Sequence, residues 1–315
     1  MNRQERRRLS KQSGRTGKAR ASANISVPDV LHQAFAFLQG GYPQESIRLY
    51  QQILAVDPKH AEALNLCAIA YFQSGEPAQA IRSLQNAVSV QPNYVEAHNN
   101  LGNVFKALGK FSEAEVAYRT AVTINPDYFD AHFNQGILLE ELNRLTEAED
   151  AYRRTHEINP EFLPALFNLG NVVKAKGEFI EAVEIYRQTI ERDPNYVDAH
   201  INLGSVLHEL GKSDEAVTSY QRALELEPNR VDAHYNLGIA LQETGKLVEA
   251  VTAYQQVLDL DAKHVAAQIN LGYALQKLGK LDDAITAYER AIEIEPHHAQ
   301  THVNLGDALL ERGEP

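Results

Sequence analysis

Histidine is the residue type whose spacing first suggests chemistry, because five histidines recur at multiples of 34 residues. Imidazoles that a fold brings together can bind a metal ion. Residues with this spacing instead occupy equivalent positions in successive structural units, and packed helices lie about 10 Å apart, too far for shared coordination. We therefore predict packing roles, and no metal site, for His98, His132, His200, His234 and His302.

Asparagine recurs with the same spacing in an unbroken series that could bind a polypeptide backbone. Each carboxamide both donates and accepts hydrogen bonds, which matches the N–H and C=O groups of an extended chain. Such a chain advances about 3.3 Å per residue, so each amide would meet about every third ligand residue. Alternatively, the amides bond to neighbouring helices and set their geometry. This asparagine ladder comprises Asn100, Asn134, Asn168, Asn202, Asn236, Asn270 and Asn304.

Acidic and aromatic residues flank the ladder at helical spacing. Residues three or four apart share one face of a helix, so these side chains are expected beside the amides. That face would prefer peptides carrying Lys or Arg, although a solvated charged surface gives the same pattern. The candidates are Asp130, Asp198, Asp232, Phe133, Phe167 and Tyr235, with Glu62, Glu96, Glu141, Glu209, Glu243 and Glu311 as further acidic positions.

The sequence contains none of the common catalytic motifs. It has no glycine-rich phosphate loop, no GxSxG and no HExxH. Cys67 is the only cysteine, so it cannot form an internal disulfide, and we predict that it is a small buried apolar residue. No catalytic residue, no cofactor and no enzymatic activity are predicted.

The ladder belongs to a 34-residue period that covers most of the chain. The period predicts two parts, a basic tail at residues 1–26 and a repeat domain at residues 27–315, with no room for a separate catalytic domain. Full units begin at Val27, Ala61, Val95, Phe129, Leu163, Val197, Val231 and Val265, and a half-unit covers residues 299–315.

Equivalent positions in the units predict two amphipathic helices of about 14 residues joined by a tight turn. Position 8 is Gly or Ala and position 24 is mostly Tyr, so small and bulky residues would pack together. Position 15 is Gly except at Asn143, and both residues suit a left-handed helix end. Position 32 is Pro except at Ala262, which ends each second helix.

These positions resemble the tetratricopeptide repeat (TPR) over residues 27–315. The resemblance implies an all-α fold, a right-handed α-solenoid of TPR helical hairpins whose first helices line a concave groove. The asparagine ladder is also similar to the repeat region of O-linked N-acetylglucosamine transferases, in which such amides hold extended substrates. TPR domains that clamp acidic chain ends carry Lys and Arg on this face, whereas this chain carries acids and amides, so that mode is not expected.

Charge is distributed unevenly along the chain. Residues 1–26 carry eight basic side chains and one acidic side chain, and the other 289 residues carry 22 basic and 41 acidic ones. The tail is expected to be disordered. The tail could serve as a solubilising arm, or it could bind nucleic acid or an anionic membrane surface. Its composition also resembles that of an organellar transit peptide, and it could dock in the acidic groove of its own or another molecule. Nucleic acid is disfavoured because the tail lacks aromatic residues for stacking.

We therefore predict a non-enzymatic scaffold that binds other proteins or extended, basic peptides in a concave, acidic, Asn-lined groove. The alternative is the substrate-binding repeat region of an O-linked N-acetylglucosamine transferase-like enzyme whose catalytic domain lies elsewhere. The last helix keeps the apolar residues Leu305 and Leu309, which predicts a homo-oligomer through residues 299–312. Neither a membrane span nor a secretory signal is expected, which favours a cytoplasmic location.

Overall fold

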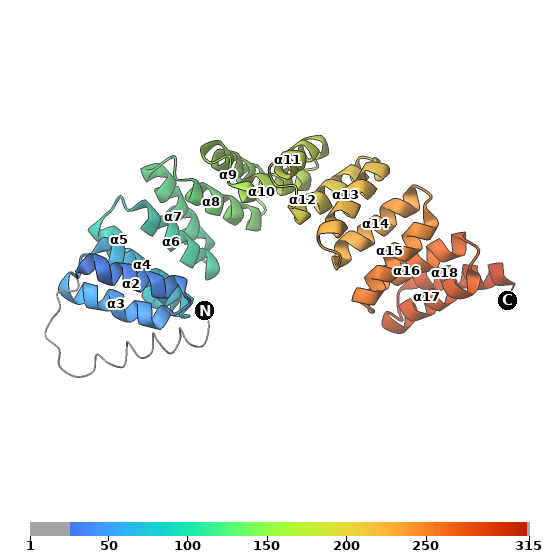
Figure 1. Cartoon of the computed structure of the whole chain (residues 1–315), viewed down its shortest axis with the longest axis horizontal. Helices are drawn as coiled ribbons and strands as arrows, with labels where there is room; N and C mark the ends of the chain where they lie inside the picture. The colour runs from blue at the N-terminus through green and yellow to red at the C-terminus, as the bar shows by residue number, and fades with distance from the viewer. Residues whose placement is uncertain (1–25, 314–315) are drawn as a thin grey trace. The chain divides into compact units, whose positions relative to one another are not determined.

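The structure is a computed structural model that describes residues 26–313 in two compact units, divided between Leu138 and Leu139. Every element within the described range is helical (Figure 1). The first unit contains α2 (Val27–Gln39), α3 (Pro43–Val56), α4 (Ala61–Gln73), α5 (Pro77–Val90), α6 (Val95–Ala107) and α7 (Phe111–Ile124). The division falls within α8 (Phe129–Glu141).

The second unit continues the same alternation of helices. It contains α9 (Leu145–Ile158), α10 (Leu163–Ala175), α11 (Phe179–Arg192), α12 (Val197–Glu209), α13 (Ser213–Leu226), α14 (Val231–Glu243), α15 (Leu247–Leu260), α16 (Val265–Lys277), α17 (Leu281–Ile294) and α18 (Ala299–Arg312).

The helices pack as sequential hairpins within each unit. In the first unit α2 packs on α3, α4 on α5 and α6 on α7, and in the second unit α10 packs on α11, α12 on α13, α14 on α15 and α16 on α17. First helices of successive hairpins also touch, as in α4 with α6 and α12 with α14. This pairing confirms the predicted all-α fold built from helical hairpins.

The cores of the hairpins are built by the tyrosine at position 24 and the small residue at position 8. A Cβ placed on Gly204 would lie 2.6 Å from the Tyr220 ring, so only glycine fits against this buried tyrosine. The tyrosines at this position are 0–2% exposed, namely Tyr50, Tyr118, Tyr152, Tyr186, Tyr220, Tyr254 and Tyr288.

The hairpin turns need a left-handed residue directly after the first helix. Asn143 has φ 55°, and the glycines at the equivalent position have φ between 70° and 90°. Asparagine tolerates this conformation better than other residues with a side chain, which explains why it is the exception to glycine here.

The described chain begins with a capped helix. The Ser26 hydroxyl accepts a hydrogen bond from the Asp29 backbone N–H, which stabilises the start of α2. The rest of the predicted tail, residues 1–25, lies outside the described residues, as do residues 314–315. Between residues 26 and 313, no helix is long and apolar enough to cross a membrane.

Candidate functional site

The candidate site lies on the first helix of each hairpin, on the surface formed by positions 2, 5, 6, 9 and 12. We call this surface the first-helix face. All seven ladder asparagines lie at position 6 and are half-buried. Half-burial restrains a side chain and still leaves part of it accessible to a ligand.

In the first unit, each ladder amide donates to an asparagine of the preceding hairpin. Asn100 Nδ2 donates to Asn65 Oδ1 at 2.9 Å, and Asn134 Nδ2 donates to Asn99 Oδ1 at 3.0 Å. Asn65 in turn hydrogen-bonds the Tyr94 hydroxyl and lowers the pKa of that phenol against the stronger, opposite effect of burial.

In the second unit, Asn202 lies at the centre of a network. Its Nδ2 donates to Asn171 Oδ1 at 2.9 Å, and its Oδ1 accepts from Lys174 Nζ at 3.2 Å. Asn171 Oδ1 also accepts from the Tyr186 hydroxyl at 2.8 Å. The ammonium fixes the orientation of the Asn202 carboxamide because an ammonium can only donate.

The remaining ladder residues of the second unit differ in their bonding. Asn168 Nδ2 donates to the Tyr152 hydroxyl at 3.5 Å, and Asn270 Nδ2 donates to the Tyr235 hydroxyl at 3.3 Å. Asn304 Oδ1 accepts from Gln300 at 3.0 Å. Asn236 makes no side-chain hydrogen bond to any other described residue. The ladder is thus partly bonded between hairpins, and the extent varies along it.

Most of the hydrogen-bonded ladder amides have the same orientation toward the rest of the protein. In Asn100, Asn134, Asn168 and Asn270 the nitrogen is engaged by the protein, and the oxygen has no hydrogen-bond partner among residues 26–313. These four amides therefore offer hydrogen-bond acceptors rather than donors.

The carboxylates of the first unit alternate with tyrosines. Burial raises the pKa of Tyr94, and the charges of Glu96 and Glu62 raise it further. Burial also raises the pKa of Tyr128, again with help from two carboxylates, Asp130 and Glu96. Glu62, Glu96 and Asp130 occupy position 2 of three successive repeats, and we call these three carboxylates the acidic stripe. Burial raises the pKa of Asp130, and a hydrogen bond from Tyr128 lowers it.

In the second unit, Arg230 forms ion pairs with two of the predicted acidic candidates, Asp198 and Asp232, and with Glu227. Its Nη1 lies 2.8 Å from Asp198 Oδ1, and its Nη2 lies 2.8 Å from Asp232 Oδ2. The hydrogen bond from Arg230 holds the pKa of Asp232 below its usual value. Asp198 and Asp232 therefore already have a cationic partner, unlike Glu62, Glu96 and Asp130 in the first unit.

The aromatic candidates also contact their neighbours. The Phe167 ring centroid lies 5.0 Å from that of Tyr196, and the Tyr235 centroid lies 4.9 Å from that of His264. Phe133 is half-buried on α8. Phe167 and Tyr235 therefore help to pack successive hairpins and also border the ladder.

The residues that orient the ladder do not follow from the 34-residue period. Asn65 and Asn99 are at position 5, and Asn171 is at position 9, so helical spacing could have placed them beside position 6. Lys174 was missed as well; it is half-buried, and burial lowers its pKa. Arg230 occupies position 34 of its 34-residue repeat, where the other full repeats carry Tyr, Phe or His. This change of residue type was the only sign of Arg230 in the sequence.

The five histidines at position 4 each bond to the turn before their own helix. Each Nε2 lies 2.8–3.0 Å from the carbonyl oxygen of the proline six residues earlier, so the ring nitrogen donates. The equivalent residue Gln268 follows Ala262 instead of proline, and its Oε1 is buried without a partner. Proline and histidine are thus replaced together in this hairpin.

Two further features bear on metal binding and on nucleophilic chemistry in the part of the chain that the structure describes. Among residues 26–313, no three His, Cys, Asp or Glu side chains are placed to hold a metal ion. Cys67 is 1% exposed, and burial raises the pKa of its thiol to about 12.

Comparisons with known families cover most of the repeats. Family profiles described as "TPR repeat" match residues 70–109, 170–211, 204–245 and 240–279. Profiles described as "Tetratricopeptide repeat" match residues 95–128 and 265–298, 117–150, and 32–81. No curated protein matches the chain significantly.

Several solved structures resemble the chain. YrrB, described as a TPR protein with an unusual peptide-binding site, is 27% identical with a TM-score of 0.54, over 60% of this chain and 97% of YrrB. MamA is 23% identical with a TM-score of 0.51, over 55% of this chain and 94% of MamA. A chain of the APC/C hetero-tetramer Cut9–Hcn1 is 18% identical with a TM-score of 0.54, over 91% of this chain and 57% of its own length.

The resemblance to O-linked N-acetylglucosamine transferases rests on the asparagine ladder alone and stays a prediction. The profiles, by contrast, match repeats in both units, and the matches over residues 95–128 and 265–298 each cover one helical hairpin, α6 with α7 and α16 with α17. The chain therefore belongs to the tetratricopeptide-repeat family.

Proposed function

We propose that the protein is a non-enzymatic scaffold that binds extended segments of other proteins on its first-helix faces, with the asparagine ladder contacting the ligand backbone. The observation that carries this proposal is the polarity of the ladder. The amides of Asn100, Asn134, Asn168 and Asn270 are fixed through their nitrogens, and their oxygens have no partner among residues 26–313.

Fixed acceptors favour a ligand that supplies donors. The backbone N–H groups of an extended peptide are such donors, and so are Lys and Arg side chains. Because the amides are already held by the protein, little side-chain entropy is lost when they bind a ligand. The half-burial of the ladder also reduces competition from water.

Charge adds a second preference. Glu62, Glu96 and Asp130 have no cationic partner among the described residues, so this part of the face favours basic ligands. In the second unit Arg230 pairs with Asp198 and Asp232, so the charge preference is weaker there. Similarity to YrrB, whose description names a peptide-binding site, also supports peptide binding.

A display library of random peptides about 12 residues long, selected on the full-length protein, tests the proposal. We expect enriched peptides to carry Lys or Arg and to bind less tightly to a variant in which Asn100, Asn134 and Asn168, three of the amides that offer acceptors, are all Ala. Three lost hydrogen bonds, each of about 0.5–1.5 kcal/mol, correspond to a loss of tenfold or more in affinity.

Asn86→Ala is the matched control because Asn86 is exposed on the second helix α5. It should leave the affinity unchanged. Failure to enrich any peptide, or enriched peptides that bind the triple variant as tightly as the original protein, would refute the proposal. In the alternative function, as part of a glycosyltransferase, the same face would bind substrate for a separate catalytic chain.

A further inference from the structure

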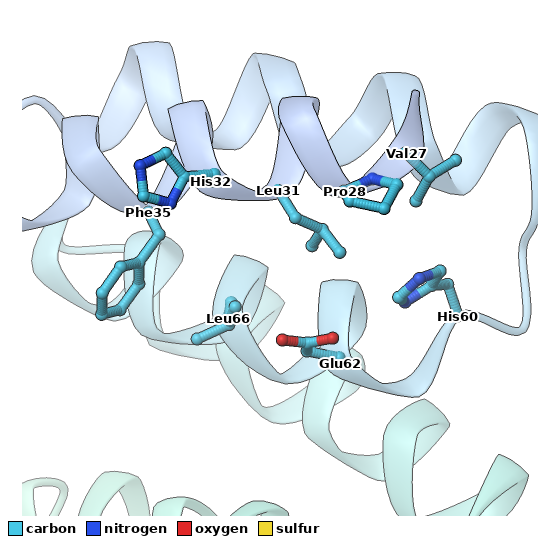
Figure 2. Close-up of a pocket in the computed structure, with 8 residues that line it drawn as sticks. All are labelled: Val27, Pro28, Leu31, His32, Phe35, His60, Glu62 and Leu66. Carbon is cyan, nitrogen blue, oxygen red and sulfur yellow. The ribbon is translucent and has the colours of Figure 1, made fainter. Parts of the chain in front are cut away.

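The first unit has an open pocket at the start of its first-helix face. The pocket has a volume of about 710 Å³ and lies between α2 and α4. Figure 2 shows Leu31 and Phe35 of α2 pointing toward α4, where Leu66 and Glu62 face them. Phe35 is 40% exposed, so the pocket combines an accessible apolar surface with a carboxylate.

The acidic stripe begins in this pocket. Glu62 lines it, and Glu96 and Asp130 occupy the same position 2 of the next two hairpins. None of the three carboxylates has an ion pair within residues 26–313. A ligand that fits must therefore offer an apolar group for the pocket and positive charge for the stripe.

One segment of this chain has that composition. Residues 6–11 read Arg-Arg-Arg-Leu-Ser-Lys, and they hold four of the eight basic side chains of the tail. Leu9 is the only Leu, Ile, Val or Phe between residues 2 and 24. The apolar side chain thus has basic neighbours on both sides.

The chain also enters the fold at the same place. Val27, the first residue of α2, lines the pocket itself. The 17 residues between Leu9 and Val27 can span about 55 Å when extended, far more than the return to an adjacent pocket requires. Closing a loop of this length costs little more than closing a shorter one.

We propose that residues 6–11 dock on their own first unit, with Leu9 in the α2–α4 pocket and the basic side chains along Glu62 and Glu96. This inference rests on the proposed function, because the docked segment occupies part of the peptide-binding face. The tail is then an intramolecular competitor that lowers the affinity of the first unit for other basic peptides.

Photo-crosslinking of the full-length protein tests the docking. The substitution Leu9→p-benzoylphenylalanine places a photoreactive ring at the predicted contact, and mass spectrometry identifies its partners. We expect crosslinks to α2 and α4, and a fall in yield when salt is raised, since salt screens exposed charges. A 1:1 mixture of light and heavy-isotope protein should give crosslinks within one copy only.

Charge reversal provides the matched comparison. Glu62→Lys with Glu96→Lys should reduce the crosslink yield about fivefold or more. Glu45→Lys with Glu113→Lys changes the net charge equally on exposed positions of α3 and α7, and it should leave the yield within about twofold. Circular dichroism verifies that both variants are folded. Scattered crosslinks, crosslinks joining light to heavy copies, or an unchanged yield after reversal at Glu62 and Glu96 would overturn the proposal.

A competition measurement separates this inference from the proposed function. Replacing Arg6, Arg7 and Arg8 by Gln should raise the affinity of a display-selected basic peptide about fivefold. If peptides are enriched but their affinity is the same with and without the three Arg→Gln changes, and no specific crosslinks form, only the docking is refuted. Specific crosslinks in a protein that enriches no peptide refute only the proposed function.

Discussion

Asn202 and Asn236 occupy the same position of successive repeats and differ in bonding, so replacing each by Ala separates structural from ligand-binding amides. Asn202→Ala removes the bond to Asn171 and the bond from Lys174. The first is worth about 0.5–1.5 kcal/mol and the second, made by a half-buried ammonium, about 1.5 kcal/mol. Alanine returns about 0.6 kcal/mol through its higher helix propensity. The free energy of unfolding should therefore fall by about 1.5–2.5 kcal/mol.

Asn236→Ala should behave in the opposite way. Asn236 makes no side-chain hydrogen bond to another described residue, so only the helix-propensity gain of about 0.6 kcal/mol remains. Peptide affinity should nevertheless fall about two- to tenfold, because one bond to the ligand backbone is lost.

Urea unfolding followed by circular dichroism and peptide titration by calorimetry measure the two quantities. Asn86→Ala, on the exposed surface of α5, controls for helix propensity and should leave affinity unchanged. The reasoning is wrong if Asn236→Ala destabilises the protein as much as Asn202→Ala does. It is equally wrong if Asn202→Ala unfolds at the same urea concentration as the original protein.

Four further outcomes are expected. Cys67, with a thiol pKa of about 12, should resist iodoacetamide at pH 8, where about one thiol in 10⁴ is ionised; rapid alkylation of folded protein would contradict its burial. Gln268→His should raise the free energy of unfolding, measured in urea, by about 0.5–1.5 kcal/mol. The substitution replaces an unpartnered oxygen with a ring nitrogen that can donate to the Ala262 carbonyl. Arg230→Gln should remove an acid-sensitive part of the stability, which melting curves between about pH 2.5 and 7 would reveal. Arg230 lowers the pKa of Asp232 in the folded protein, so the ion pair stabilises the fold at pH values above the unfolded pKa of about 3.9. That stabilisation is lost as the pH falls through the lowered pKa of the folded state. Leu310→Glu should abolish self-association in light scattering, since Leu310 is 66% exposed on α18; a monomer at high concentration before the change would exclude this interface.

The fold could be predicted because each repeat position imposes its own steric demand. Gly204 must be small because the Tyr220 ring lies against it, and Asn143 must accept a positive φ. These requirements are local to one hairpin, so the residue type at one position of the 34-residue repeat is enough to reveal each of them. Helix ends follow in the same way from glycine, proline and their substitutes.

The hydrogen bonds of the ladder could not be predicted from the residue type at position 6 alone. Asn202 and Asn236 are identical in type and position, yet only Asn202 has a suitable acceptor in the preceding hairpin, Asn171. That choice depends on side-chain placement across an interface, which periodicity does not report. Arg230 cannot be found from periodicity either, because it bonds Asp198, 32 residues away at the other end of its own repeat, and Asp232 of the next repeat.

The direction of the ladder bonds affects how such a protein could evolve by duplication. Asn100 reaches position 5 of the preceding repeat, Asn202 reaches position 9, and Asn270 reaches a tyrosine at position 5. The donor and its acceptor are therefore inherited on different repeats. A repeat copied beside one that lacks the acceptor would lose its inter-repeat bond, whereas a tandem copy of residues 95–128, which carry both Asn99 and Asn100, would keep it.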